Sequence, residues 1–237
     1  MKIIENEVRG IPMKFVAYTR SLELCSRMNY ETENLDFIDQ IGQGETIYDL
    51  GACEGRFSIY AALKGIVCYS FEPEKNNYAA FLENVDINQL SDKVLKPFKL
   101  AVGDKNKTGK LKIGQPWAGG HQKVIEQAEV RDDLNFEFKE EEVVDVVSLD
   151  EFIARDGIDF PAYLKVDVDG SEMAFIKGAQ KTLADKRLKK IIFELEINDK
   201  NFTSIVSNLS HNGLEETGRF QVPNEKYLYN IIFTRVN

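Results

Sequence analysis

The stretch YDLGACEGRFS, residues 48–58, decides the fold of this chain. An apolar run over residues 46–50 predicts a buried strand, and Gly51 stops that strand where a turn into a helix should follow. Beyond Gly55, apolar side chains recur three and four positions apart, as on one face of a helix, at Phe57, Tyr60 and Ala61. The unit is therefore a strand, a glycine turn and a helix, which places a ligand at a helix N-terminus.

The glycine spacing restricts which cofactor this turn can bind. A dinucleotide fingerprint needs glycine at the second and fifth positions after Gly51, where Cys53 and Arg56 stand, so NAD is disfavoured. A P-loop is excluded because no Gly-Lys-Ser/Thr triplet closes the turn. What remains is an acidic residue, Asp49, two positions before Gly51, and a second glycine, Gly55, four positions after it.

Length, charge and cysteine content limit the class of protein. A chain of 237 residues with 43% hydrophobic content can bury the core of one domain. The net charge of −9 repels nucleic acids and anionic membranes, so we expect neither as a partner. The N-terminal sequence MKIIENEVRG lacks the apolar region of a signal peptide, and no apolar run of about 18 residues follows, which predicts a soluble, cytoplasmic protein. The oligomeric state stays open.

The three cysteines, Cys25, Cys53 and Cys68, are too far apart for a CxxC pair, and their odd number argues against a disulfide framework. Cys53 lies in the glycine turn. We interpret it as a small space-filling residue, with a reactive thiol as the alternative.

Apolar periodicity alternates between strands and helices along the rest of the chain. Further strands are predicted over residues 67–71, 94–102, 163–168 and 191–196. Helices are predicted around the apolar stripe from Tyr78 to Val85, from the capping box at Ser148 to an end near Asp156 and Gly157, and over residues 171–184 and 202–209. The segments GLEETGRF and YLYNIIFTRV predict a closing antiparallel hairpin.

This alternation predicts an α/β fold with a doubly wound, mostly parallel sheet, in which ligands bind outside the carboxyl ends of the strands. Residues from about 103 to 147 break the alternation with short strands and a loop, so we expect a β-rich insertion after the third strand.

One acidic residue, Glu72, is placed to bind the ribose of an adenosine. Glu72 ends the second strand about 20 residues beyond Gly51, the separation at which an acidic residue reaches the ribose hydroxyls of an adenosine. Pro73 then ends the strand and fixes the approach of that carboxylate. Taken alone, Glu72 would be an ordinary exposed acid at a strand end, but the turn before it favours the ribose.

Charged residues alternate along the two later strands. In YLKVDVDG, the side chains of Lys165, Asp167 and Asp169 share one face, and in IIFELE those of Glu194 and Glu196 do. Buried charges need partners, so Lys165 is expected to pair with an acid of a neighbouring strand, such as Glu194. Asp167 and Asp169 lie nearer the strand end, where function is more common. A divalent metal held by Asp167, Asp169 and Glu196 is an alternative, but we predict no metal.

The chain has only two histidines. His211 follows a predicted helix and should be solvated. His121 follows Trp117 and two glycines in the insertion, so a mobile loop could bring it to a substrate.

Five segments, in this order, resemble the FkbM family of S-adenosylmethionine-dependent methyltransferases: IYDLGACEGRFS, FEPEKNNYAAFLENV, LAVGDKNKTGKLKI, VVSLDEFIA and YLKVDVDGSEMAFIKGAQ with the following IIFELE. The resemblance covers roughly residues 30–200. It implies a seven-stranded class I methyltransferase sheet of the Rossmann-like kind, with an antiparallel last strand, and O-methylation of a small molecule or sugar.

The resemblance also implies a division into a cover segment, residues 1–44, and a methyltransferase domain, residues 45–237. Its cofactor residues, carried over by position, fall into three groups: the turn around the methionine part, the ribose site and the adenine border. They are Asp49, Gly51, Ala52, Cys53, Glu54 and Gly55 for the first, Phe71 and Glu72 for the second, and Leu100, Ala101 and Val102 for the third.

Asp167 belongs to the same set of cofactor residues and would face the methyl-transfer site. It is our first choice for the base that takes the proton of the acceptor, with His121 second. Two motifs depart from the family, which usually has Asn where Cys53 stands and DVEGAE where this chain reads DVDGSE. The alternative function is a cofactor-binding or partner-binding protein on the same fold that does not catalyse methyl transfer. The identity of the acceptor cannot be read from the sequence.

Overall fold

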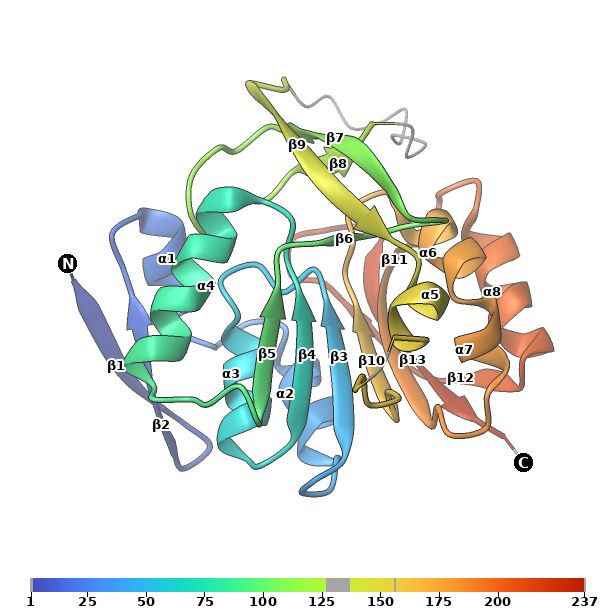
Figure 1. The fold of residues 1–237 in the computed structure, drawn as a ribbon, viewed down its shortest axis with the longest axis horizontal. Coiled ribbons are helices and arrows are strands. Elements are labelled where there is room, and N and C mark those ends of the chain that lie inside the picture. The colour runs from blue at the N-terminus through green and yellow to red at the C-terminus, as the bar shows by residue number, and fades with distance from the viewer. Residues whose placement is uncertain (1, 127–136, 156, 237) are drawn as a thin grey trace.

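The protein is described by a computed structural model that covers residues 2–126, 137–155 and 157–236. Among these residues, seven strands form the main sheet (Figure 1). Their order is β12 (Leu214–Gln221), β13 (Leu228–Arg235), β11 (Lys190–Glu196), β10 (Tyr163–Val166), β3 (Thr46–Leu50), β4 (Val67–Phe71) and β5 (Leu95–Phe98). All pairings are parallel except the two that β13 makes, so the closing hairpin and the mostly parallel sheet are both confirmed.

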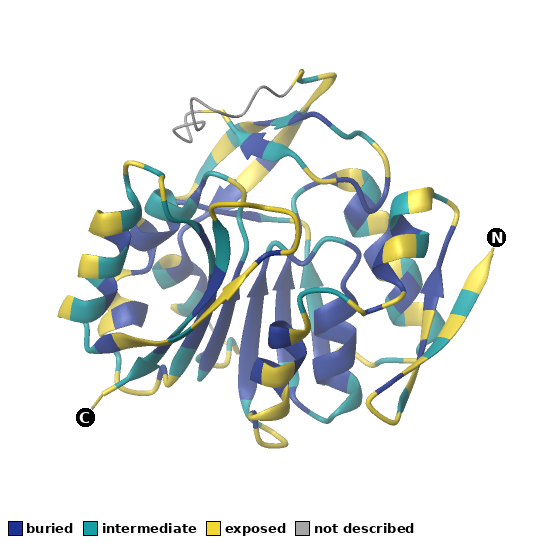
Figure 2. Cartoon of the chain, turned by 180° about the vertical axis from the view of Figure 1, so that it is seen from behind, coloured by how far each residue is buried: buried dark blue, intermediate teal, exposed yellow. Residues whose placement is uncertain are grey.

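Helices pack against both faces of this sheet because its central strands are apolar on both sides. Tyr48 and Leu50 of β3 belong to one buried cluster and Ile47, which points the other way, to a second. The first cluster includes residues of α5 (Leu149–Ile153), α6 (Glu172–Gly178), α7 (Gln180–Ala184) and α8 (Phe202–His211). The second includes residues of α2 (Thr32–Asp39), α3 (Arg56–Leu63) and α4 (Lys75–Ile87). Figure 2 shows the central strands buried and the outer sides of the helices exposed.

The N-terminal residues form β1 (Ile3–Val8), β2 (Ile11–Val16) and α1 (Arg20–Cys25), and the two strands pair as a separate antiparallel sheet. Asn84 of α4 holds this hairpin, because its side-chain oxygen accepts a 2.8 Å hydrogen bond from the backbone N–H of Val16. The same amide donates to the carbonyl of Glu54 at 2.9 Å. One buried side chain therefore ties the N-terminal hairpin to the glycine turn.

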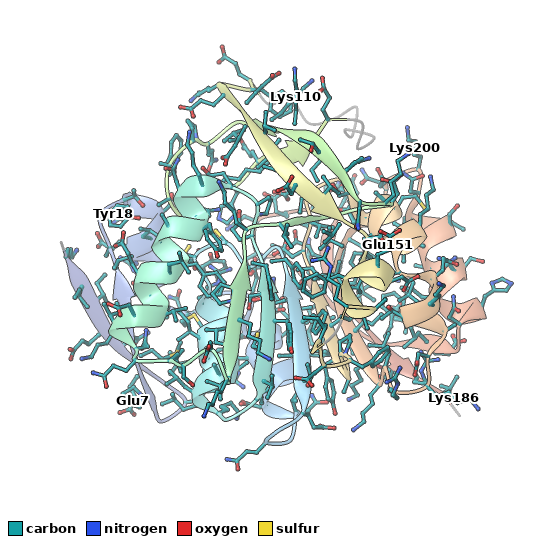
Figure 3. All side chains as sticks on the ribbon, viewed as in Figure 1. Glu7, Tyr18, Lys110, Glu151, Lys186 and Lys200 are labelled. Carbon is teal, nitrogen blue, oxygen red and sulfur yellow. The ribbon has the colours of Figure 1, made fainter. Side chains whose placement is uncertain are left out.

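A second, smaller sheet lies over the carboxyl ends of β3, β4 and β5 (Figure 1). Its order is β6 (Ala101–Val102), β9 (Glu140–Val147), β7 (Lys107–Ile113) and β8 (Lys123–Ile125). Lys110 of β7 is at the opposite end of the molecule from Glu7 and Lys186 (Figure 3). The part of the expected insertion from residue 127 to 136 lies outside the described residues.

Three predicted elements differ from the structure. The strand expected over 94–102 is two strands in different sheets, because the chain leaves the main sheet after Phe98. The strand expected over 163–168 ends at Val166, since Asp169 and Gly170 both have positive φ and turn the chain. The helix expected over 171–184 divides at Gly178, where a Cβ would lie 2.0 Å from the carbonyl oxygen of Gly103. The predicted helix end near Asp156 falls on a residue outside the described ranges.

Each of the three cysteines is a free thiol. In the part of the chain that the structure describes, no helix is both long and apolar enough to cross a bilayer. The cytoplasmic location expected from the sequence stays a prediction.

Candidate active site

The turn between β3 and α3 depends on glycine at two positions. Gly51 has φ +85°, and a Cβ there would lie 1.7 Å from the carbonyl oxygen of Asp167. Gly55 has φ +83°, and a Cβ there would lie 2.1 Å from the ring of Phe81. Any other residue would therefore clash as well as strain the backbone. Gly51 lets the turn approach the residue that follows β10, and Gly55 lets it approach α4.

Glu72 fixes the middle of the same turn. Its Oε2 accepts a 2.9 Å hydrogen bond from the backbone N–H of Cys53, whose φ is 52°, and its Oε1 accepts a 3.0 Å bond from the N–H of Glu74. Burial raises the pKa of Glu72 to about 7. Each carboxylate oxygen retains a second lone pair, so Glu72 can still accept hydrogen bonds from a ligand.

Lys165 connects β3 to the end of β10. Its Nζ lies 3.2 Å from Oδ1 of Asp49 and 3.3 Å from Oδ2 of Asp167, and the side chains of Lys165 and Asp49 are 5% and 2% exposed. Burial alone would lower the pKa of Lys165, but the two carboxylates outweigh it and raise the pKa. Among the described residues Lys165 pairs with Asp49 of the neighbouring strand β3, as expected for a buried charge, but the partner is not Glu194.

The turn and the strand ends surround a cavity, which we call the turn cavity. The small sheet contributes Leu111, Lys123 and Ile125 to its lining. Of the residues predicted to bind a cofactor, all but two line it: Gly51, Ala52, Cys53, Glu54, Phe71, Glu72, Leu100, Ala101, Val102 and Asp167. The structure brings these residues together from four segments of the sequence.

Gly55 and Asp49, predicted to contact the cofactor, do not line this cavity. Gly55 packs beside Phe81, and Asp49 lies beneath the turn, where its Oδ2 accepts a 2.5 Å hydrogen bond from Ser58 and its other oxygen faces Lys165. Asp49 is therefore placed to hold Lys165.

A second cavity adjoins the first, and we call it the acidic cavity. The two share Arg56, His121, Asp167 and Asp169. The remaining acidic groups of its wall come from the N-terminal segment, α6, β11 and the chain that follows β11 and β12: Glu31, Glu172, Glu194, Glu196, Asp199 and Glu225. Burial raises the pKa of Glu172 to about 7.

Three of these carboxylates form a compact group. Oxygen atoms of Asp167, Asp169 and Glu194 lie within 4.8 Å of one another. Burial, and then the neighbouring charge of Asp167, raises the pKa of Glu194. The metal alternative considered from the sequence named Glu196, whereas the structure places Glu194 in this group.

His121 is exposed and lines both cavities. Its loop is anchored by Asn77 of α4, whose side chain accepts a 2.8 Å hydrogen bond from the N–H of Gly119 and donates at 3.3 Å to the carbonyl of Gly120. His211 is exposed at the end of α8 and lines neither of the two cavities, in agreement with the prediction.

Several residues of the site were not predicted from the sequence. Arg56, 8% exposed, lies between Glu31, 2.8 Å from its Nη2, and the hydroxyl of Tyr30. Lys123 of β8 forms a 2.9 Å ion pair with Glu74, whose carboxylate also caps α4. A charge at position 56, within an otherwise apolar helix face, was the one local signal. The other contacts join segments too far apart to be read from spacing.

Comparison with protein families now identifies the chain. Residues 49–215 match the model described as "Methyltransferase FkbM domain". The chain belongs to the FkbM methyltransferase family. The residues that match include the glycine turn, strand β10 and the small sheet of this FkbM protein. A comparison with curated protein sequences gave no match.

Solved structures with a similar fold to this FkbM protein include the following two. A precorrin-6y C5,15-methyltransferase from Geobacter metallireducens has a TM-score of 0.51 and 11% identity, over 94% of this chain and 95% of that one. Trm5b from Pyrococcus abyssi has a TM-score of 0.52 and 12% identity, over 98% of this chain and 55% of that one. At such identities the likeness establishes the fold alone.

Proposed function

We propose that this FkbM protein is an S-adenosylmethionine-dependent methyltransferase that methylates a hydroxyl group of a small molecule or sugar. The observation that carries the proposal is the junction of the two cavities at Asp167. On one side lie the residues predicted to hold the cofactor, and on the other lies room for an acceptor. A methyl group transferred between them would pass beside the Asp167 carboxylate.

The turn cavity fits this cofactor on three observations. Glu72 has lone pairs left to receive the two ribose hydroxyls. Glu54 lines the cavity, and among the described residues neither of its carboxylate oxygens accepts a hydrogen bond. Leu100, Ala101 and Val102 supply an apolar border for adenine. When bound, S-adenosylmethionine supplies a methyl group already activated on a sulfonium.

Asp167 is suited to act as the base. Its side chain is 31% exposed, and Lys165 holds one of its oxygens at 3.3 Å, which leaves the other for an acceptor hydroxyl. In the proposed reaction, Asp167 takes the hydroxyl proton as the new oxygen–carbon bond forms, and a base positioned in this way contributes roughly 10²- to 10⁴-fold. The rest of the rate comes from alignment of the reactants and exclusion of water. His121 is the second candidate because it lines the same junction.

The acidic cavity supports a small acceptor without phosphate groups. Among the described residues of its wall, Arg56 and His121 are the basic side chains, and Arg56 is already ion-paired with Glu31. Such a wall repels a phosphate backbone, which supports the expectation of no nucleic-acid substrate. Carboxylates accept hydrogen bonds from hydroxyl groups, so the same wall suits a hydroxyl-rich molecule.

The test is transfer of labelled methyl groups from S-adenosylmethionine to a metabolite extract, with the product identified by mass spectrometry. A labelled product with a methyl ether is the expected result. Binding of the cofactor without transfer to any component would favour the alternative, a cofactor-binding protein that does not catalyse. Methylation of carbon or nitrogen would keep the methyltransferase and reject the hydroxyl acceptor.

A further inference from the structure

Glu54 is a buried acid without hydrogen bonds. The residue is 1% exposed, and neither Oε1 nor Oε2 accepts a hydrogen bond from any described residue. A carboxyl group removed from water in this way is destabilising unless something else supplies the missing donors. Because Glu54 lines the turn cavity, a ligand bound there can supply them.

The nearest cation does not satisfy Glu54. Nη1 of Arg56 lies 4.0 Å from Oε1 of Glu54, which is beyond hydrogen-bond distance. Arg56 donates instead to Glu31 and to the hydroxyl of Tyr30, and its guanidinium stacks 4.4 Å above the Tyr30 ring. Arg56 is thus held by the N-terminal segment, and Glu54 is left with a distant positive charge and no donor.

The other titratable neighbours of Glu54 include two thiols, Cys25 and Cys53, and the phenol of Tyr30, whose hydroxyl is bonded to Arg56 and Cys25. Burial, and then the charge of Glu54, raises the pKa of Cys25 to about 12, and the same two causes raise the pKa of Cys53. Protonated thiols are weak hydrogen-bond donors, and the structure shows none of them bonded to Glu54. Neither the thiols nor the Tyr30 hydroxyl donates a hydrogen bond to the Glu54 carboxylate, so both of its oxygens still lack donors.

We propose that Glu54 receives the ammonium group of the amino-acid part of S-adenosylmethionine. The inference rests on the proposed function and adds which group of the cofactor this residue recognises. An ammonium brings three N–H donors and a positive charge, enough to satisfy both oxygens of Glu54. The ribose hydroxyls have Glu72, the sulfonium has no N–H, and the cofactor's own carboxylate would be repelled.

The test compares two ligands on two proteins by calorimetry. S-adenosylhomocysteine carries the ammonium, whereas 5′-methylthioadenosine lacks the whole amino-acid part. Glu54→Gln should weaken S-adenosylhomocysteine by roughly ten- to a hundredfold, the usual effect of losing a charged hydrogen bond, and leave 5′-methylthioadenosine unchanged. Equal affinities of the variant and the unmodified protein for S-adenosylhomocysteine would overturn the inference.

Thermal unfolding of the ligand-free proteins separates this role from a structural one. If Glu54 serves to bind a ligand, Glu54→Gln removes an unsatisfied buried charge from the ligand-free protein and should raise its melting temperature. If Glu54 is a structural partner of Arg56, the same change should lower it and overturn the inference. Glu33→Gln is the matched control, because Glu33 is buried, accepts a 2.7 Å hydrogen bond from Asn230 and lines neither cavity, so it should destabilise without changing ligand affinity.

A measurement on the unmodified protein tests the inference even if the Glu54→Gln variant fails to fold. On the unmodified protein, an S-adenosylhomocysteine analogue with hydrogen in place of the amino group should bind at least tenfold more weakly than S-adenosylhomocysteine itself. Equal binding of the two would overturn the inference and leave the proposed function standing. If neither S-adenosylhomocysteine nor 5′-methylthioadenosine binds, the proposed function fails along with it.

Discussion

The two adjoining cavities are built in opposite ways. The turn cavity is lined by short segments at the carboxyl ends of β3, β4, β5 and β10 and by the small sheet, and Glu72 in its wall is fixed by hydrogen bonds from the main-chain N–H groups of Cys53 and Glu74. The acidic cavity is walled by side chains from the N-terminal segment, the small sheet and the last strands. A common cofactor can be held by backbone geometry, whereas acceptor choice can vary through side chains without disturbing that geometry.

The largest effect is expected at Lys165, which lines the turn cavity and forms an ion pair with Asp167 where the two cavities meet. Lys165→Met should lower the free energy of unfolding by about 3–5 kcal/mol, since Asp49 would keep a buried charge without its cation. Urea unfolding measures the loss. The double variant Lys165→Met/Asp49→Asn should recover part of it, and a single variant as stable as the unmodified protein would show that the pair is not needed.

Asp167→Asn should separate the two cavities by function. The change keeps the size of the side chain but removes the base, so turnover should fall by about 10²-fold while cofactor affinity changes little. The loss of stability should be small, because Lys165 retains Asp49. Turnover, affinity and melting temperature are measured on one preparation. A stable variant with full turnover would transfer the search for a base to His121, with His121→Ala as the next variant.

Glu72→Gln tests the turn cavity through the pH dependence of ligand binding. The pKa of Glu72 is raised from 4.5 to about 7, so in the ligand-free protein much of this group is protonated below neutral pH. Ribose hydroxyls need the ionised acceptor, and affinity for S-adenosylhomocysteine should rise between about pH 5.5 and pH 8, at most tenfold per pH unit. Glu72→Gln should weaken binding by roughly ten- to a hundredfold and flatten this rise. An unchanged profile would remove Glu72 from the ribose site.

The raised pKa of Glu72 changes protein stability with pH in the opposite direction to ligand affinity. Protonation favours the folded state when the folded pKa of an acid is raised, so the contribution of Glu72 to stability should fall as pH rises from about 4.5 through 7. Glu72→Gln should remove that part of the pH dependence, which a series of ligand-free unfolding curves would show.

Cys53→Asn tests the turn cavity through a smaller effect, the cost of the backbone conformation at this position. Cys53 has φ 52°, a left-handed conformation that Asn adopts at less cost than Cys, and the family usually has Asn here. We expect a gain of about 0.5–1 kcal/mol, or roughly 1–4 °C in melting temperature. Gln89→Asn, at φ 54° and outside both cavities, is the control and should give a similar gain. A loss at position 53 with a gain at 89 would mean that the thiol packs better than the amide.

Chelation of metals should have no effect on turnover. The carboxylate group of Asp167, Asp169 and Glu194 is shared between an ion pair with Lys165 and the acidic wall, and the proposed reaction uses Asp167 as a base. Turnover in EDTA is compared with turnover in buffer containing magnesium. A loss in EDTA that magnesium restores would assign these carboxylates to a cation.

Features that depend on residues close together along the chain could be predicted from the sequence. The strand, turn and helix around Gly51 follow from local periodicity, and Glu72 follows from its distance along the chain, so the lining of the turn cavity could be anticipated. Asp49 was predicted to contact the cofactor, yet every residue of β3 is buried, and a charge in such a strand needs a cation on its neighbour. The register of β3 against β10, which sequence spacing does not contain, sets Asp49 opposite Lys165.

The acidic cavity could not be predicted for the same physical reason. Glu31 reaches Arg56 only after separate segments have packed together. Alternation placed Glu194 and Glu196 on one face of β11 but could not show which of them meets Asp167. That choice depends on how far the chain turns after Val166, where Asp169 departs from strand geometry.

The pairing of β3 with β10 has a consequence for the order of folding. These neighbours at the centre of the sheet are distant along the chain, as the hydrogen bond from Tyr48 to the carbonyl of Asp159 shows by spanning 111 positions. Closing so long a loop is slow, and its entropic cost precedes any gain from the contacts it makes. We expect β3, β4 and β5 to associate while the remainder of the chain is still being synthesised. Both cavities, which require β10, would then be absent from the nascent protein until the second half of the sheet docks.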